Sequence, residues 1–288
     1  MFTISQEQRQ FKTYILTDDA TQARLEVVPE RGGIITQWQV KGHDLLYMDA
    51  ERFANPEVSI RGGIPILFPI CGNLPDNTYT HSGKSYTLKQ HGFARELSWT
   101  VAEQNTEEGS IGLELESSDR TRAVYPFDFH IRFTYQLKEN ALEIHQTYTN
   151  LSSEAMPFST GLHPYFPVSD KSQLTFDIPA TEYLDQLTQT THPFPGNFDF
   201  EQDEIDVAFR DVSRQSASAA DASRKIRMAI DYDLIYSTVV FWTVKGKDYY
   251  CLEPWTAPRN AFNTGENLIQ LEAGSSLRTL VCLRVAFE

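Results

Sequence analysis

Short runs of alternating apolar and polar residues recur along most of the chain. The period of two and the many β-branched and aromatic residues are typical of β-strands that bury one face. Turn-forming residues separate the runs, for example at 32–33 and 138–140. The runs span residues 24–28, 112–116, 130–137, 142–148, 174–178, 237–243, 249–253 and 277–285.

Helical patterns are weak by comparison. The best candidate, residues 215–225, is short and rich in Ser and Ala, and a loop is the alternative. The stretch from Pro193 to Asp211 predicts a loop over a surface or a site mouth. Many strands without strand–helix alternation predict an all-β fold, either a large antiparallel sandwich or a barrel. Because no internal repeat or linker divides the chain, we expect residues 1–288 to form a single domain.

The composition favours a globular protein and disfavours polyanionic partners. Hydrophobic residues make up 41% of the chain, and 25 basic against 39 acidic residues give a formal net charge of −14. This negative field repels nucleic acid and anionic membranes, so we expect neither as a partner. A local cluster of arginines can still override the global field and bind a phosphorylated ligand.

Several features predict a cytoplasmic location. Cys71, Cys251 and Cys282 lie in apolar contexts without a C-x-x-C spacing, which predicts buried free thiols in a reducing compartment. Residues 1–6 lack the basic and apolar regions of a signal peptide. No apolar run approaches the ~18 residues of a membrane-spanning helix.

His163 and Glu253 are the strongest candidates for chemistry. His163 lies between a Gly-ended apolar segment and Pro-Tyr-Phe-Pro, so we expect a partly desolvated imidazole. Glu253 ends an apolar strand just before Pro-Trp, where a carboxylate is costly unless it is paired or used. Such a pair can give one proton while it takes another, which is the chemistry of opening a sugar ring. The alternatives are a core histidine and a glutamate paired with Arg259.

Two other segments place basic residues beside glycines. Residues 61–72 begin with Arg61 and contain three glycines and two prolines, which predicts an irregular, rigid wall or a crossing loop with a surface arginine. In residues 90–95, His91 and Arg95 flank Gly-Phe-Ala. They offer donors to hydroxyls or to an anion, unless His91 only satisfies a buried carbonyl.

Four motifs follow one another along the chain in a specific order. They are Arg61-Gly62-Gly63-Ile64-Pro65 with Phe68-Pro69, Gln90-His91-Gly92-Phe93-Ala94-Arg95, Gly161-Leu162-His163-Pro164-Tyr165-Phe166 and Leu252-Glu253-Pro254. Weaker matches lie at 183–185 and 204–209. Together they resemble the aldose 1-epimerase (mutarotase) superfamily, most closely its hexose-6-phosphate mutarotase-like branch. The resemblance implies a galactose mutarotase-like β-supersandwich of large antiparallel sheets, with few short helices and an open sugar groove on one sheet face.

The resemblance also implies catalytic and binding roles. In the family, the histidine matching His163 protonates the ring oxygen, and the glutamate matching Glu253 removes the proton of the C1 hydroxyl. The histidine matching His91 binds or polarises the ring side. The residue matching Asp206 binds sugar hydroxyls.

Further substrate contacts follow from the same resemblance. Arg61 and Arg95 match arginines that are linked with the phosphate in phosphate-specific members. Candidates to stack on the apolar face of the sugar are Phe68, Tyr165 and Trp255. One departure is Glu96, which follows Arg95 where some phosphate-specific members place a Lys, and its charge would repel a phosphate. Other departures from the branch are Val207, Phe209 and the pair Trp242-Thr243.

These observations predict an isomerase of the aldose 1-epimerase type that interconverts the α and β anomers of a hexose or hexose 6-phosphate. Ring opening requires no cofactor and no metal; His91 and His163 could share a metal, but no third ligand is evident. The expected partner is a small sugar or sugar phosphate, and the protein is expected to be a monomer or a homodimer. The alternatives are a non-catalytic carbohydrate-binding or sugar-sensing protein on the same fold, and a glycoside hydrolase built on Glu253 and Asp206.

Overall fold

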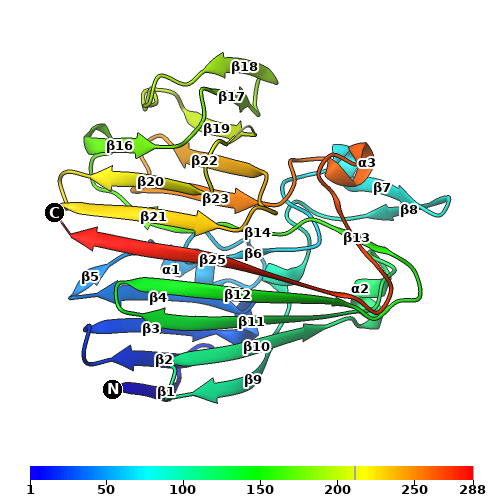
Figure 1. Cartoon of the computed structure of the whole chain (residues 1–288), viewed down its shortest axis with the longest axis horizontal. Coiled ribbons are helices and arrows are strands. Elements are labelled where there is room, and N and C mark those ends of the chain that lie inside the picture. The colour runs from blue at the N-terminus through cyan, green and yellow to red at the C-terminus, as the bar shows by residue number, and fades with distance from the viewer. Residues whose placement is uncertain (211, 288) are drawn as a thin grey trace.

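Antiparallel strands dominate the computed structural model, which describes residues 1–210 and 212–287. They form three large sheets and two hairpin-like pairs (Figure 1). The predicted all-β antiparallel fold is confirmed. The first sheet, at the N-terminal end of the chain, has the order β1 (Phe2–Gln8), β2 (Lys12–Asp18), β3 (Ala23–Val28), β4 (Ile34–Val40) and β5 (His43–Asp44).

The second sheet forms the long central layer of the molecule. Its β11 and β12 bury alternate residues along ten-residue strands, as their sequence period of two predicts. The C-terminal strand β25 lies between β12 and β21, so distant parts of the chain meet in the middle of this sheet (Figure 1). The order is β16 (Leu174–Asp177), β20 (Ser216–Asp221), β21 (Ile226–Tyr232), β25 (Ser276–Phe287), β12 (Ala141–Asn150), β11 (Phe129–Lys138), β10 (Ser110–Glu116) and β9 (Thr100–Asn105).

The third sheet positions the candidate site residues. Every residue of its strand β23 is buried, so this strand is covered on both faces. The order is β18 (Thr190–Pro193), β17 (Glu182–Asp185), β19 (Glu204–Phe209), β22 (Thr238–Val244), β23 (Tyr249–Trp255), β14 (Gly161–Leu162) and β6 (Ile66–Leu67), and β15 (Tyr165–Pro167) also pairs with β23.

The remaining elements are short. The small strand pairs are β7 (Thr78–His81) with β8 (Lys84–Thr87) and β13 (Met156–Phe158) with β24 (Ile269–Leu271). The α-helices are α1 (Ala50–Ala54), α2 (Asp119–Arg122) and α3 (Ala261–Thr264), and 3-10 turns lie at Pro29–Arg31, Pro75–Asn77, Ala94–Glu96 and Lys171–Gln173. In the described part of the chain, no helix has the length and apolar character needed to span a membrane.

Two segments differ from expectation. Residues 215–225, the best helix candidate with a loop as the alternative, form the strand β20 and the turn that follows it, because pairing with β16 and β21 overrides a weak helical propensity. The predicted loop from Pro193 to Asp211 contains β19, which pairs with β22 along its whole length. Asp211 itself lies outside the described residues. By contrast, residues 61–72 are irregular as predicted, with only β6 as strand.

Phe68 belongs to the core and not to the sugar site, which corrects its predicted role in stacking on a sugar. Its side chain is fully buried. Its ring lies within 5.3–5.9 Å of five other aromatic rings, those of Phe93, Tyr125, Phe129, Tyr148 and Phe158. The rings belong to separate segments of the chain, so this cluster joins the motif segments 61–72 and 90–95 to the central sheet.

Replacing Phe68 tests this structural role. We expect Phe68→Ala to lower the free energy of unfolding by about 3–5 kcal/mol, because it removes a buried ring and leaves a cavity. Chemical denaturation measures the change. Leu187→Ala, at a side chain that is 55% exposed, is the control and is expected to shift stability by less than about 0.5 kcal/mol. A Phe68→Ala protein as stable as this control would contradict the assignment to the core.

Candidate active site

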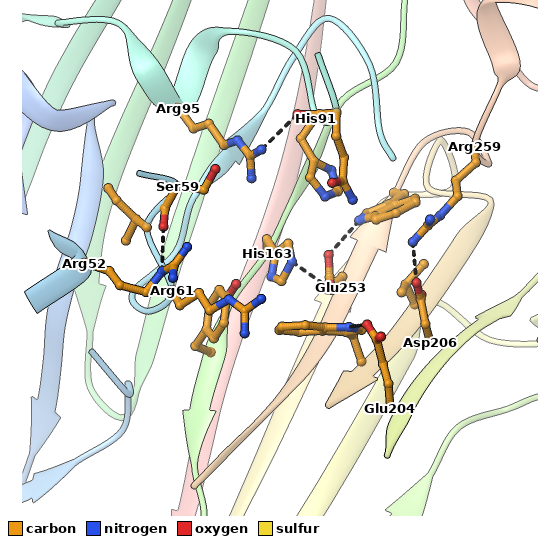
Figure 2. Close-up of a pocket in the computed structure, with 16 residues that line it drawn as sticks. Arg52, Ser59, Arg61, His91, Arg95, His163, Glu204, Asp206, Glu253 and Arg259 are labelled. Atoms are coloured by element: carbon orange, nitrogen blue, oxygen red, sulfur yellow. Dashed lines mark hydrogen bonds and ion pairs between the residues drawn. The ribbon is translucent and has the colours of Figure 1, made fainter. Parts of the chain in front are cut away.

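A cavity of about 290 Å³ collects the site residues that the sequence singled out, with the exception of Phe68 (Figure 2). It opens beside the third sheet, and the side chains that face it come from strands, loops and the short helix α1. Its lining residues are Arg52, Ser59, Ile60, Arg61, Gln90, His91, Arg95, His163, Tyr165, Glu204, Asp206, Val240, Trp242, Glu253, Trp255 and Arg259.

His163 is held between the two short strands β14 and β15. Gly161 lies two residues before it. Only glycine fits there without a clash, because a Cβ atom at this position would lie 2.7 Å from Trp255 Cδ1. The backbone N–H of His163 donates to Pro65 O at 3.1 Å. The Tyr165 ring stacks on the imidazole, with ring centroids 4.7 Å apart and planes at 7°. These contacts hold the ring in one orientation.

Glu253 extends from the middle of β23 toward His163. Its Oε1 lies 3.4 Å from His163 Nε2, and its Oε2 accepts a hydrogen bond of 3.1 Å from Trp255 Nε1 (Figure 2). Glu253 is 1% exposed and His163 7% exposed. The indole of Trp255 therefore orients the carboxylate. The structure brings together the two groups that the sequence identified.

Burial acts on the two groups in opposite directions. Desolvation, helped by the nearby charge of Arg95, lowers the pKa of His163 to about 3. Burial and the charge of Asp206 raise the pKa of Glu253 well above its ordinary value. The pair therefore holds one proton over a wide range of pH, and in this structure burial favours its location on Glu253.

His91 is fixed as a neutral donor. Its Nδ1 accepts a hydrogen bond of 3.1 Å from the backbone N–H of Gly72, so its proton lies on Nε2. Burial and the nearby Arg95 lower the pKa of His91 well below its ordinary value. The adjacent Gly92 has φ +68, and a Cβ atom there would meet Phe68 O at 2.2 Å. This glycine lets the His91 turn pack directly against the motif at Phe68.

Asp206 and Arg259 form the opposite side of the cavity. Arg259 Nη2 lies 2.6 Å from Asp206 Oδ2, and Gln186 Nε2 donates to Asp206 Oδ1 at 2.7 Å. The possible partner of Glu253 in the sequence, Arg259, thus pairs with Asp206 instead. Beside them, Trp242 Nε1 donates to Glu204 Oε1 at 2.7 Å.

Arg61 and Arg95 lie on the other side of His163. Arg61 Nη1 donates to Tyr249 Oη at 3.3 Å, and its guanidinium lies 5.3 Å from the centre of the Trp242 ring. Arg95 Nη2 donates to Gln90 O at 2.9 Å, while its buried Nε has no partner among the described residues. Both arginines keep N–H groups available to a ligand.

Three side chains of the site also have the chemistry of metal ligands. Ligand atoms of His163, Cys251 and Glu253 lie within 4.8 Å of one another. His91, considered from the sequence as a second histidine ligand beside His163, is not part of this group. A metal bound there would occupy both members of the His163–Glu253 pair.

Cys71 and Cys251 are buried free thiols as predicted, whereas Cys282 is only partly buried.

The sequence missed some lining residues. Trp242 was recognised only as a departure from the branch, and Glu204 only as part of a weak motif. Arg52 carries no sequence signal, because it lies on a short helix outside all four motifs. Its place in the cavity depends on how α1 packs beside residues 59–61.

Comparisons with known proteins identify the family of the chain. Residues 14–281 match the sequence model of the family described as aldose 1-epimerase, so the chain belongs to the aldose 1-epimerase family. A curated relative from Cenchrus ciliaris, named "Putative glucose-6-phosphate 1-epimerase", is 29% identical over 168 residues, which are 54% of this chain and 48% of that protein. The match thus spans about half the length of that relative. Protein LacX (plasmid) of Lactococcus lactis subsp. lactis is 25% identical over 75% of this chain and 80% of its own.

Solved structures confirm the galactose mutarotase-like fold. Slr1438 from Synechocystis sp. PCC 6803 is 47% identical, with 100% of both chains covered and a TM-score of 0.95. A galactose mutarotase-like protein from Clostridium acetobutylicum, CA_C0697, is 21% identical and covers 100% of this chain and 99% of its own, with a TM-score of 0.84.

The buried imidazole leads to a prediction about acid stability. Because the pKa of His163 is lower in the folded than in the unfolded protein, His163 destabilises the fold progressively as pH falls from about 6.5 toward 3. The free energy of unfolding of wild type is expected to fall relative to that of His163→Asn, by up to about 1.4 kcal/mol per pH unit. Denaturation at several pH values measures the difference, with His43→Asn at an exposed histidine as control. Parallel pH curves for wild type and His163→Asn would contradict it.

Proposed function

We propose that the protein is an aldose 1-epimerase that interconverts the α and β anomers of a hexose or hexose 6-phosphate. The observation that carries the proposal is the contact of His163 Nε2 with Glu253 Oε1 at 3.4 Å inside a polar cavity. The ring oxygen and the anomeric hydroxyl of a pyranose are both attached to C1. Two neighbouring proton-transfer groups can therefore reach both oxygens at once.

The proposed reaction moves two protons in one direction and returns them in the other. The Glu253 carboxylate takes the proton of the C1 hydroxyl, and the His163 imidazolium gives one to the ring oxygen. The bond between C1 and the ring oxygen breaks and leaves an open-chain aldehyde. After rotation about the C1–C2 bond, the ring closes on the other face of the carbonyl and both protons return.

The substrate itself helps to place the shared proton. Burial favours the proton on Glu253, whereas the reaction begins with a carboxylate and an imidazolium. A sugar hydroxyl that donates to Glu253 stabilises its charged form, and a ring oxygen that accepts from His163 Nε2 stabilises the imidazolium. Sugar binding thus favours transfer of the proton across the 3.4 Å contact.

The other lining residues fit a sugar and leave its phosphorylation open. His91 Nε2–H and the Asp206–Arg259 pair offer donors and acceptors to hydroxyls, and Tyr165 and Trp255 add aromatic side chains to the lining. Arg61 and Arg95 support an anionic substituent, as does the name of the relative from Cenchrus ciliaris. We propose a cytoplasmic enzyme whose reaction involves no cofactor.

The alternatives receive less support. A glycoside hydrolase needs two carboxyl groups free to face one bond, whereas both oxygens of Asp206 are engaged by Arg259 and Gln186. A sugar-binding protein without turnover needs no contact between His163 and Glu253. Sugar binding without faster anomer exchange would favour this second alternative.

Removing either member of the pair tests the mechanism. We expect His163→Asn and Glu253→Gln each to lower kcat/KM for anomer exchange by about 10²–10⁴, because each removes a general acid–base group. Polarimetry or NMR exchange spectroscopy measures the rate, and circular dichroism checks the fold.

A second His–Glu pair provides a matched control. His145 Nε2 lies 3.0 Å from Glu143 Oε2 on the exposed side of β12. His145→Asn and Glu143→Gln are expected to leave the rate unchanged. Full activity in both His163→Asn and Glu253→Gln would reject the assignment.

The pH dependence of the rate follows from the shifted pKa values. The pair keeps one proton between the lowered pKa of His163 and the raised pKa of Glu253, so kcat/KM is expected to be flat across neutral pH. Its acid limb should lie well below the ordinary histidine pKa of about 6.5. Rates at controlled buffer concentration measure the profile. An acid limb centred near pH 6.5 would contradict this prediction, because it would indicate a histidine with an ordinary pKa of about 6.5 that is exposed to solvent.

A further inference from the structure

We propose that Arg52 is the third guanidinium of an anion-binding wall and determines specificity for an aldose that carries a phosphate ester. This inference rests on the proposed function, because it names the substrate class of the same cavity. The wall consists of Arg52, Arg61 and Arg95. All three line the cavity on the same side of His163, whereas Glu204 and Asp206 lie on the other side (Figure 2).

The local structure holds Arg52 in place by one end of its guanidinium. Asp49 caps α1 by accepting from the backbone N–H of Arg52 at 3.0 Å, and the backbone N–H of Asp49 donates to Arg61 O at 2.9 Å. The helix is thereby tied to the segment that carries Arg61. Arg52 Nε donates to Ser59 O at 3.0 Å. No described residue is a hydrogen-bond partner of its two terminal nitrogens.

No guanidinium of this wall is held in an ion pair. Among the described residues, Arg52, Arg61 and Arg95 make no ion pair with an acidic side chain. Several other arginines do form such pairs, as Arg9 does with Glu26 at 2.7 Å. In a chain with a net charge of −14, three unpaired guanidinium groups around one cavity form a local positive field.

Arg31 shows what a structural arginine looks like in this protein. It is buried, and its guanidinium donates to three backbone carbonyls, those of Phe53, Asn55 and Val58. Arg52 makes only one such bond. Its remaining N–H groups are therefore free for a ligand in the cavity that it lines.

The position of Glu96 outside the cavity of the pair weakens the objection that the sequence raised against a phosphate. Glu96 is exposed and lines a second cavity, of about 410 Å³, on the far side of Arg95. It does not line the cavity of the His163–Glu253 pair. Arg52 thus supplies to the site a positive charge that position 96 lacks. A phosphate monoester, with three acceptor oxygens, suits several guanidinium groups at once.

The test compares two substrates that differ only in the phosphate. Anomer exchange of glucose 6-phosphate and of glucose is measured for wild type, Arg52→Ala and Arg52→Lys. Arg52→Ala is expected to lower kcat/KM for the phosphate ester by about 10–100-fold, mainly through KM, since charge-assisted hydrogen bonds are lost. The rate with glucose should change less than about 2-fold, and Arg52→Lys should recover part of the loss because it keeps the charge.

Arg120→Ala is the matched control. Arg120 is exposed and lines the second cavity but not the first, so its removal should leave the ratio of the two substrates unchanged. Equal loss with both substrates in Arg52→Ala would assign Arg52 a merely structural role and overturn the inference. An unchanged rate with glucose 6-phosphate would overturn it as well.

The outcome separates this inference from the proposed function. Acceleration of both sugars by wild type without preference for glucose 6-phosphate would overturn the inference and leave the epimerase assignment standing. If wild type accelerates neither sugar, the proposed function fails. Calorimetry then measures the binding of the same two sugars to wild type and to Arg52→Ala, and this tests the role of Arg52. Weaker binding of glucose 6-phosphate alone by Arg52→Ala supports the wall; equal affinities in wild type and variant overturn it.

Discussion

The buried contact between His163 and Glu253 is the constraint on which the site depends. A carboxylic acid in the middle of a strand that is covered on both faces is expensive to charge. An imidazole stacked on Tyr165 and surrounded by aromatic rings is expensive to charge as well. Holding a single proton between them avoids both costs, and it keeps one donor and one acceptor ready for any substrate that reaches the cavity.

The rest of the fold supports this contact from two directions. The third sheet supplies Glu253 and Trp255 from β23 and Asp206 from β19. Both strands pair with β22 between them, so the relative positions of these residues are set by strand register. Irregular segments supply His163, His91 and the arginines, and the aromatic cluster around Phe68 joins two of these segments, 61–72 and 90–95, to the central sheet. The result is a cavity with Glu204 and the Asp206–Arg259 pair on one side of His163 and with Arg52, Arg61 and Arg95 on the other (Figure 2).

Much of the fold followed from the sequence because alternation survives wherever a strand has one buried face. It was clearest in β11 and β12. It failed where neighbours decide the structure: β20 is rich in Ser and Ala and is a strand because β16 and β21 pair with it. The acidic residues around β19 concealed a strand in the same way. The proposal of a single domain stays a prediction.

Prediction of the site had a different limit. Motif residues such as His91, His163 and Glu253 were found because their local surroundings are unusual. Phe68 shares a motif with Arg61, yet its side chain packs into the core, since a motif does not say which way a side chain points. Arg52 and the Asp206–Arg259 pair depend on contacts between distant segments, which no local pattern records.

The most direct measurement is the rate of anomer exchange in the wild-type protein, followed by NMR exchange spectroscopy on glucose and glucose 6-phosphate. A sugar whose anomers interconvert faster than in matched buffer, in proportion to the protein concentration, is the result expected of the His163–Glu253 pair. Exchange at the buffer rate for glucose, galactose and glucose 6-phosphate alike would contradict it.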